Sequence, residues 1–408
     1  MENETAPTPE GSKASTFAGV SCTAGTACTA VGSQTTNLGA TVPLAERWNG
    51  ATWTPQPTPA PEGAKSSLLK GVSCTSATVC TAAGYAVNSA KVLVPLAERW
   101  NGTKWEIQST PVPAGGTENI LASISCTSAS NCVAVGKFSS PYSLPLAMQW
   151  DGTKWSLIQP PKPENSVVSW LSGVSCTSAT FCVATGAYLD NFLIEKTLAM
   201  LWDGTKWIVK TTPNPGAQLN GLAAVSCTSA TACTAVGSFY SEPGPSKVLT
   251  ERWNGVSWQV QETPGPEGSK KAELLGVSCA AATVCTSVGV FTNSAGTNLS
   301  LAEKWDGTKW TLQSSPNPEG AKETVLRGIS CTSSTACTAV GSFKSSAGIQ
   351  LSLAERWTGS NWTIHSTPNP EGAKSSNLAG VSCLAASCEA VGGVQNGSGI
   401  GVPLAEGY

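Results

Sequence analysis

The segment Gly71-Val72-Ser73-Cys74-Thr75-Ser76-Ala77-Thr78-Val79-Cys80-Thr81-Ala82 belongs to a motif that recurs about every 52 residues along the chain. Each copy carries two cysteines, so the sixteen cysteines of the 408 residues fall into pairs. The pairs are Cys22/Cys28, Cys74/Cys80, Cys126/Cys132, Cys176/Cys182, Cys227/Cys233, Cys279/Cys285, Cys331/Cys337 and Cys383/Cys388. A fixed period near fifty residues indicates a repeat architecture.

The even pairing favours disulfides and an oxidising compartment. Metal binding is the alternative, and we expect no metal site and no cofactor. Zinc requires four ligands, usually with two to four residues between paired cysteines and often with histidine. Here five residues separate most pairs, and the chain holds one histidine, His365.

One copy is expected to contain four short antiparallel strands. In the copy from Leu326 to Pro368, residues 326–331 and 337–341 form a hairpin whose base the cysteine pair staples. Residues 351–357 and 361–364 form a second hairpin, whose turn reads Asn-Gly or Asp-Gly in most copies. That dipeptide predicts a type I′ turn, in which both central residues have positive φ. A Pro-x-Pro linker ends the copy, because proline cannot donate to a strand ladder.

Four antiparallel strands in about fifty residues predict a blade of a β-propeller, with a solenoid as the alternative. The fold class is therefore all-β. We expect one domain over residues 1–408, an eight-bladed propeller whose last blade lacks its own fourth strand. Residues 1–6 occupy the register of that missing strand and are expected to complete the last blade. The expected blades are 18–58, 69–110, 121–160, 170–212, 222–263, 274–315, 326–367, and 378–408 with 1–6.

The repeat resembles the kelch-like propeller repeats of secreted bacterial proteins. The resemblance is carried by Ala339-Val340-Gly341, by the hairpin from Glu98 to Trp105 and by Pro316-Asn317-Pro318, and it extends over the whole chain. Paired glycine in the second strand, typical of true kelch repeats, occurs only at Gly392-Gly393. Such propellers serve as binding modules and as enzyme scaffolds, so the resemblance implies fold more than function.

Composition excludes several classes of partner. Charged residues make up 12% of the chain and the formal net charge is −2, with no run of Lys or Arg, so we expect no nucleic-acid partner. No apolar run approaches the roughly 18 residues needed to span a bilayer, so membrane insertion is not expected. The first residues lack the features of a signal peptide. We expect a monomer that is secreted or attached to the cell surface, its signal peptide being absent from this sequence.

Fourteen of the fifteen tryptophans form pairs on the second hairpins, from Trp48/Trp53 to Trp357/Trp362. They are expected to lie on one hairpin face as diagonal neighbours. They either wedge adjacent blades together or form a repeated sugar-stacking platform. A glutamate stands two residues before the first tryptophan in five copies and is expected opposite the second tryptophan. These glutamates are Glu46, Glu98, Glu251, Glu303 and Glu355, and Met148 and Met200 replace them in the third and fourth copies.

No catalytic residue is predicted. His365 stands where other copies carry Gln108 or Gln313, and Asp151, Asp203 and Asp306 lie in turns. No nucleophile elbow, phosphate-binding loop or metal-ligand spacing is present.

A candidate contact site appears where the repeat is broken. Trp170 is the unpaired tryptophan, and we expect it in the linker before the first strand of the fourth copy. Tyr188 and Phe192 lie between the second and third strands of that copy. Phe138 and Tyr142 come from the matching connection of the third copy, as do Phe239 and Tyr240 in the fifth. These aromatic side chains are expected to gather on one face of the propeller, either as a binding surface or as a local packing variant.

The function expected from these observations is non-enzymatic binding of a protein or glycan outside the cell. Two alternatives remain open: a multivalent lectin that uses the Trp/Glu hairpins, and an enzyme acting on polysaccharides.

Overall fold

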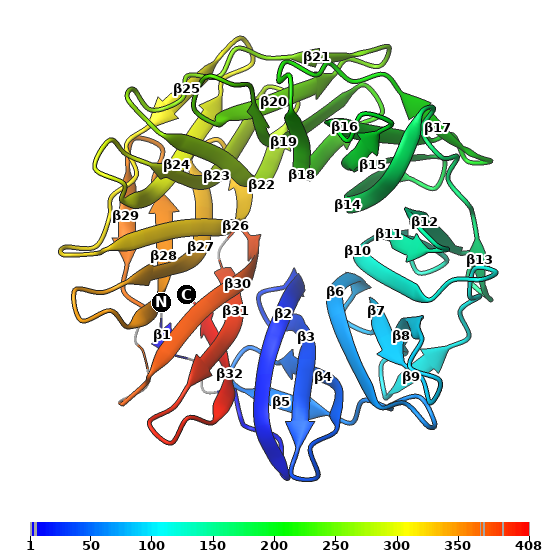
Figure 1. The fold of residues 1–408 in the computed structure, drawn as a ribbon. Helices are drawn as coiled ribbons and strands as arrows, with labels where there is room; N and C mark the ends of the chain where they lie inside the picture. Colours follow the sequence, from blue (N-terminus) through cyan, green and yellow to red (C-terminus); the bar gives the residue numbers. More distant parts are fainter. Residues whose placement is uncertain (1, 4–5, 368, 370–371, 386, 408) are drawn as a thin grey trace.

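A computed structural model of the chain describes residues 2–3, 6–367, 369, 372–385 and 387–407. These residues form strands, turns and loops, and no helix occurs among them. The strands radiate in small sheets around a central axis and give a closed ring (Figure 1). The all-β class and the propeller arrangement expected from the repeat are confirmed.

The repeat unit is an antiparallel sheet of four strands in chain order, and the first strand lies nearest the axis (Figure 1). Units are numbered here in chain order from one to eight, as are the sequence copies. The first strands are β2 (Ser12–Ala24), β6 (Ser66–Ser76), β10 (Glu118–Ser128), β14 (Ser166–Ser178), β18 (Leu219–Ser229), β22 (Lys271–Ala281), β26 (Glu323–Ser333) and β30 (Ser375–Leu384). The second strands are β3 (Ala27–Thr36), β7 (Val79–Val87), β11 (Asn131–Ser139), β15 (Phe181–Asp190), β19 (Ala232–Tyr240), β23 (Val284–Thr292), β27 (Ala336–Lys344) and β31 (Ser387–Gln395).

In units 1 to 7 the outer two strands form the tryptophan hairpin. The third strands are β4 (Thr41–Trp48), β8 (Leu93–Trp100), β12 (Ser143–Trp150), β16 (Glu195–Trp202), β20 (Lys247–Trp253), β24 (Asn298–Trp305), β28 (Gln350–Trp357) and β32 (Gly401–Gly407). The fourth strands are β5 (Trp53–Gln56), β9 (Trp105–Gln108), β13 (Trp155–Leu157), β17 (Trp207–Lys210), β21 (Trp258–Val260), β25 (Trp310–Gln313) and β29 (Trp362–His365). First strands begin several residues before the predicted blade starts, for example at Ser12 rather than at residue 18.

The eighth unit is completed from the other end of the chain. β1 (Glu2–Asn3) pairs antiparallel with β32, with Glu2 opposite Gly407 and Asn3 opposite Glu406. This pairing is the closure predicted for residues 1–6; Met1, Glu4 and Thr5 lie outside the described residues.

Every cysteine pair is a disulfide within one unit, as predicted, and no free cysteine occurs among the described residues. The two cysteines of a pair lie directly opposite each other on the first and second strands, so each bridge clamps the end of the inner hairpin. The bridges are Cys22–Cys28, Cys74–Cys80, Cys126–Cys132, Cys176–Cys182, Cys227–Cys233, Cys279–Cys285, Cys331–Cys337 and Cys383–Cys388.

The second cysteine of each bridge has a role that the sequence analysis did not predict. The pattern indicated only a staple at the base of a hairpin, whereas the structure places these sulfurs in the hydrophobic core. Cys28, Cys80, Cys132, Cys182, Cys233, Cys285, Cys337 and Cys388 are 0–4% exposed, while their partners on the first strands are half-buried.

The reason for this burial is the packing of one unit on the next. The Cys80 sulfur lies 3.4 Å from Thr29 Oγ1 of the preceding unit, and Cys285 makes the same contact with Thr234. In units 1 to 7 the second cysteine stands opposite a buried tryptophan of its own sheet, as Cys28 does opposite Trp48. The cysteines therefore belong to the scaffold between units rather than to a binding site.

The serine before each first cysteine also joins neighbouring units. Its hydroxyl accepts a hydrogen bond from the backbone N–H of the first cysteine in the next unit, as from Cys74 N to Ser21 Oγ at 3.0 Å. The same bond repeats at every junction around the ring, including the junction between the last and first units, where Cys22 N donates to Ser382 Oγ. The Ser-Cys dipeptide thus fixes the register between units.

The hairpin turn differs from the prediction. Trp48 and Trp53 lie directly opposite each other, so Gly50 and Ala51 are the central residues rather than Asn49 and Gly50. Only the glycine has positive φ, at 95°. The Asn49 carboxamide oxygen instead accepts hydrogen bonds from the backbone N–H groups of Ala51 and Thr52. The dipeptide is therefore an Asx cap followed by the glycine of a II′-type turn.

Candidate functional site

The paired tryptophans are structural. Their exposed fractions run from 2% at Trp202 to 8% at Trp48, and the paired ring centroids lie 5.7–6.1 Å apart. Arg47 stacks over Trp100 of the next unit at 4.7 Å, and Arg99 stacks over Trp150 at 5.0 Å. The rings wedge adjacent units together and leave no face for a sugar.

The glutamates of the third strands are also buried, but not where predicted. Glu46 lies opposite Pro55 and Glu98 opposite Ile107, because the tryptophans pair with each other. Glu355 of unit 7 faces the preceding unit, where its carboxylate accepts a 2.6 Å hydrogen bond from Ser315 Oγ of unit 6. Both carboxyl oxygens of Glu46, Glu98 and Glu303 are buried without a hydrogen-bond partner among the described residues, so these side chains offer no surface to a ligand.

Burial without compensating charge changes how these glutamates ionise. Burial raises the pKa of Glu46, Glu98, Glu251 and Glu303 to about 8, so these four are mostly protonated at neutral pH. At Glu355 the pKa is raised by burial only to about 7, because the hydroxyls of Ser315 and Ser300 act in the opposite direction. Glu406, whose carboxylate accepts from Ser352 Oγ, likewise has its pKa raised by burial to about 7.

The predicted aromatic cluster is not a single surface. Trp170 lies within β14 rather than in a linker, opposite Ala187, whereas Tyr188 lies opposite Ser169. Neighbouring positions of a strand point to opposite faces of the sheet, so the two rings face different units. Tyr188 packs against the core between units 3 and 4, and Phe192 is 83% exposed in the loop after β15.

The other predicted rings repeat this division. Phe138 is 8% exposed and belongs to the core, as does partly buried Phe239, whereas Tyr142 is 60% exposed in a loop. Phe291 and Phe343 stand at the register position of Tyr188 in units 6 and 7 and also pack against the core. Tyr188 thus fills a packing position shared by several copies, which explains why the expected cluster separates.

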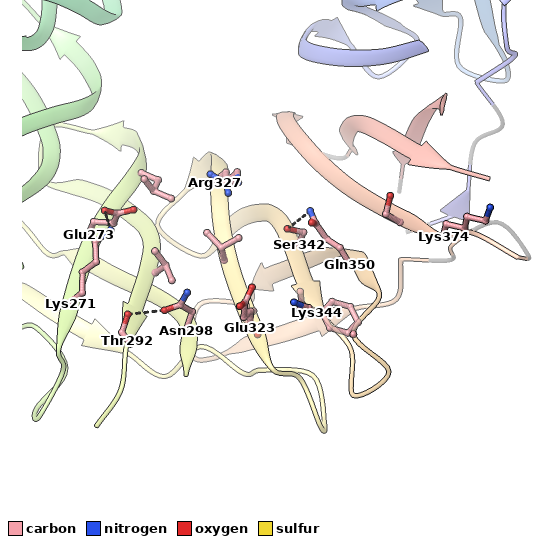
Figure 2. Close-up of a pocket in the computed structure, with 17 residues that line it drawn as sticks. Lys271, Glu273, Thr292, Asn298, Glu323, Arg327, Ser342, Lys344, Gln350 and Lys374 are labelled. Carbon is pink, nitrogen blue, oxygen red and sulfur yellow. Dashed lines mark hydrogen bonds and ion pairs between the residues drawn. The ribbon is translucent and has the colours of Figure 1, made fainter. Parts of the chain in front are cut away.

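A different feature forms a candidate binding surface. A groove of about 590 Å³ crosses units 6 and 7 and reaches unit 8. It lies on the face of the propeller that carries the connections between second and third strands. Figure 2 shows its side chains along β22, β26 and β27, with Lys374 just before β30. We call it the charged groove. Its ionisable lining residues are Lys271, Glu273, Glu323, Arg327, Lys344 and Lys374.

Cations outnumber carboxylates in the charged groove, four to two. Lys271 Nζ lies 2.9 Å from a Glu273 carboxylate oxygen, so this cation is partly neutralised. Glu323 and Lys344 are directly opposite on β26 and β27. Arg327 and Lys374 lie on successive units and carry the excess positive charge. A groove of this kind is suited to an anionic ligand.

Neutral hydrogen-bonding groups complete the lining. Thr292 Oγ1 donates to Asn298 Oδ1 at 2.7 Å, and Gln350 Nε2 donates to Ser342 Oγ at 3.2 Å (Figure 2). These bonds orient the two amides at the third-strand edge of the groove.

A smaller cavity of about 170 Å³ adjoins the charged groove and shares Glu273 with it. Trp170 and Glu195 line its other side, on unit 4. Trp170, predicted as part of a contact site, therefore lies beside a groove that the sequence analysis did not identify. Sequence comparison between copies could have pointed to this region. Glu273 and Trp170 occupy the same position of the repeat, where other copies carry Thr16, Leu68 or Ile120.

Within the described part of the chain, no group of three or more His, Cys, Asp or Glu side chains is placed to hold a metal ion. The same residues include no helix long and apolar enough to cross a membrane.

Neither a protein family nor a curated protein matches this sequence. Among solved structures, the chain resembles a polysaccharide lyase described as an ulvan lyase, with a TM-score of 0.54, 10% identity, and coverage of 87% of this chain and 97% of that one. A WD40 β-propeller domain of Doa1 matches at a TM-score of 0.45 and 8% identity, covering 83% and 92%. A six-bladed propeller lectin from Aleuria aurantia matches at 0.40 and 11% identity, covering 69% and 90%.

At these identities the likeness concerns the fold alone. The chain is a β-propeller repeat protein with a disulfide in every unit.

Proposed function

We propose that this chain is an extracellular, kelch-like, eight-bladed propeller that binds an acidic polysaccharide in the charged groove without transforming it. The eight-bladed ring is supported by the serine–cysteine hydrogen bonds, which link each unit to the next and the last to the first. The extracellular location is supported by the disulfides, since such bonds persist in oxidising environments.

The observation that carries the ligand class is the excess of cations along the groove. Lys271, Arg327, Lys344 and Lys374 come from three successive units, so they present positive charge over an extended path. A polymer with a repeating negative charge engages several of them at once. The neutral amides of Asn298 and Gln350 provide hydrogen-bonding partners for sugar hydroxyls.

Binding is the role that the groove's own contacts favour. Glu273 forms an ion pair with Lys271, and Glu323 stands at the ladder position opposite Lys344, so each carboxylate has a cation on a facing or neighbouring position. The lectin alternative based on the tryptophan hairpins loses its support, because those rings are buried between units.

The test is binding of a uronate-containing or sulfated polysaccharide, with neutral dextran as the negative probe, followed by calorimetry at low and high salt. We expect saturable binding of the acidic polymer that weakens as salt rises. Arg327→Glu should reduce affinity at least tenfold. Lys70→Glu is the matched control, because Lys70 occupies the register position of Arg327 in unit 2, outside the groove.

Equal binding of dextran, or an Arg327→Glu variant with unchanged affinity, would contradict the proposal. The same incubation tests for enzymatic activity. If size-exclusion chromatography shows that the polysaccharide has become shorter, the protein is an enzyme acting on polysaccharides rather than a binding protein.

A further inference from the structure

Unit 5 lacks a polar contact that three other units share. In unit 4, Asn214 of the Pro-Asn-Pro linker accepts a 2.8 Å hydrogen bond from the backbone N–H of Thr197. In unit 6, Asn317 makes the same bond with Ser300 N at 3.1 Å. In unit 7, Asn369 bonds the hydroxyls of Ser352 and Ser376. A linker asparagine thus acts as an internal amide ligand beside the third strand.

Three substitutions remove this ligand from unit 5 together. Gly265 replaces the linker asparagine and Val248 replaces the serine or threonine of the third strand. Ala272, on the first strand of unit 6, occupies a position that is Ser, Thr or Asn in every other copy. Those other residues are Ser15, Ser67, Asn119, Ser169, Asn220, Thr324 and Ser376.

The vacated space is a pocket of about 520 Å³. Val248, Gly265 and Ala272 all line it, together with Phe239 and Val260. A Cβ built on Gly265 would meet no atom within 4 Å, so the position of the missing asparagine side chain is open. We call this cavity the unit 5 pocket.

The pocket retains the backbone groups that the asparagine satisfies elsewhere. By register, the N–H of Val248 points as that of Thr197 does, away from the second strand and toward the linker. Neither Gly265 nor Ala272 has a side-chain acceptor for it. The carboxamide of Asn214 also donates to the carbonyl of Thr212, and the equivalent carbonyl in unit 5 belongs to Thr263, which lines the pocket. The Val248 N–H and the Thr263 carbonyl have no linker amide to bond with. They therefore favour a ligand that supplies both a hydrogen-bond acceptor and a donor.

We propose that the unit 5 pocket binds the acetamido group of an N-acetylated amino sugar. The acetamido carbonyl accepts from Val248 N–H, and its N–H donates to the Thr263 carbonyl, so the ligand reproduces the asparagine contacts. The methyl group meets Ala272 and Val248. The pocket is far larger than one carboxamide, and Phe239 supplies an aromatic wall for the sugar ring.

This site is separate from the charged groove. Ala272 points to the unit 5 side of β22, whereas its neighbours Lys271 and Glu273 line the groove on the other side. The inference therefore does not depend on the acidic polysaccharide, and the two ligands can be tested independently on one protein.

The experiment is saturation-transfer NMR and calorimetry of the full chain with N-acetylglucosamine, glucosamine, glucose and N-acetyl-asparagine amide. We expect N-acetylglucosamine to bind at least tenfold more tightly than glucose or glucosamine. The two sugars without an acetamido group would leave the Val248 N–H and the Thr263 carbonyl without hydrogen-bonding partners, and a site built for such bonds rejects ligands that cannot make them. Equal affinity for the three sugars would overturn the proposal. Preference for the asparagine derivative over the sugar would replace the sugar by a peptide.

The matched variant is Val248→Ser with Gly265→Asn, which restores the pair found in units 6 and 7. It should abolish N-acetylglucosamine binding without lowering the melting temperature, because Gly265 has no positive φ that an asparagine would strain. Ala60→Asn, at the same linker position of unit 1, should leave binding unchanged. A folded double variant that still binds the sugar would overturn the proposal.

Discussion

Ser382 Oγ accepts a 3.0 Å hydrogen bond from the backbone N–H of Cys22, joining residues that are 360 positions apart in the sequence. The same serine–cysteine contact joins residues 51 to 53 positions apart at the other junctions. A single motif position thus performs the same task at the junction that closes the ring as at those along the chain.

The first prediction concerns this closure. Ser382→Ala should lower the free energy of unfolding by about 1–3 kcal/mol, because the Cys22 N–H loses its acceptor in a half-buried site. Ser226→Ala removes the equivalent bond to Cys279 within the chain and serves as the comparison. Chemical denaturation of both variants gives the measurement. Two variants as stable as the parent would show that the junctions do not depend on these bonds.

The second prediction concerns the buried glutamates and pH. Burial raises the pKa of Glu98 from its usual value of 4.5 to about 8, so between these values the folded state holds a proton that the unfolded state releases. The contribution of Glu98 to the free energy of unfolding is therefore fully present below about pH 4.5, and it is lost as the pH rises through about 8. Glu98→Met should therefore raise the melting temperature most at pH 8 and above, and least near pH 4.

Methionine is a suitable replacement because Met148 and Met200 occupy this position in units 3 and 4. The reverse change, Met148→Glu, should lower stability and add pH dependence. Thermal unfolding of parent and variants from about pH 4 to 9 tests both. Parallel curves for Glu98→Met and parent would refute the buried ionisation.

The third prediction concerns the clamp between hairpins. Arg99 stacks over Trp150 and donates through Nη2 to the carbonyl of Ala129. Arg99→Ala should cost about 1–3 kcal/mol, because both the cation–π contact and a charged hydrogen bond are lost. Arg99→Lys should recover much of this, since Lys304 makes both contacts in unit 6. Urea unfolding midpoints compare the three proteins, and equal midpoints would contradict a stabilising clamp.

The fourth prediction separates the two aromatic residues of unit 4. Phe192→Ser should change stability by no more than about 0.5 kcal/mol, because the ring is exposed. Tyr188→Ser should cost about 3 kcal/mol, because this ring packs against the core between units 3 and 4. Denaturant titration distinguishes them. A loss on Phe192→Ser as large as on Tyr188→Ser would mean that the exposed ring packs against the protein in solution.

Local features were predictable from the sequence. The disulfides, the strand order within a copy and the completion of the last unit by N-terminal residues follow from the period and the strand register. The type I′ turn was wrong because the side chain of Asn49 competes for the turn's backbone groups, which a dipeptide rule does not include.

Contacts between copies were less predictable. The role of Ser73 depends on a partner 53 residues later, and the burial of Cys80 depends on Thr29 of the unit before it. The charged groove needs side chains from three units that no local pattern brings together. Trp170 and Tyr188 were misjudged because one residue of register decides which side of a blade a side chain faces.

The buried glutamates also alter the electrostatic character of the whole molecule. The formal charge of −2 counts every carboxylate as ionised. With Glu46, Glu98, Glu251 and Glu303 protonated at pH 7, removing four negative charges from −2 leaves +2, and partial protonation of Glu355 and Glu406 makes the charge more positive still. The native protein should therefore migrate toward the cathode at neutral pH and bind a cation exchanger, whereas the unfolded chain migrates toward the anode. Electrophoretic mobility consequently reports on folding in this protein.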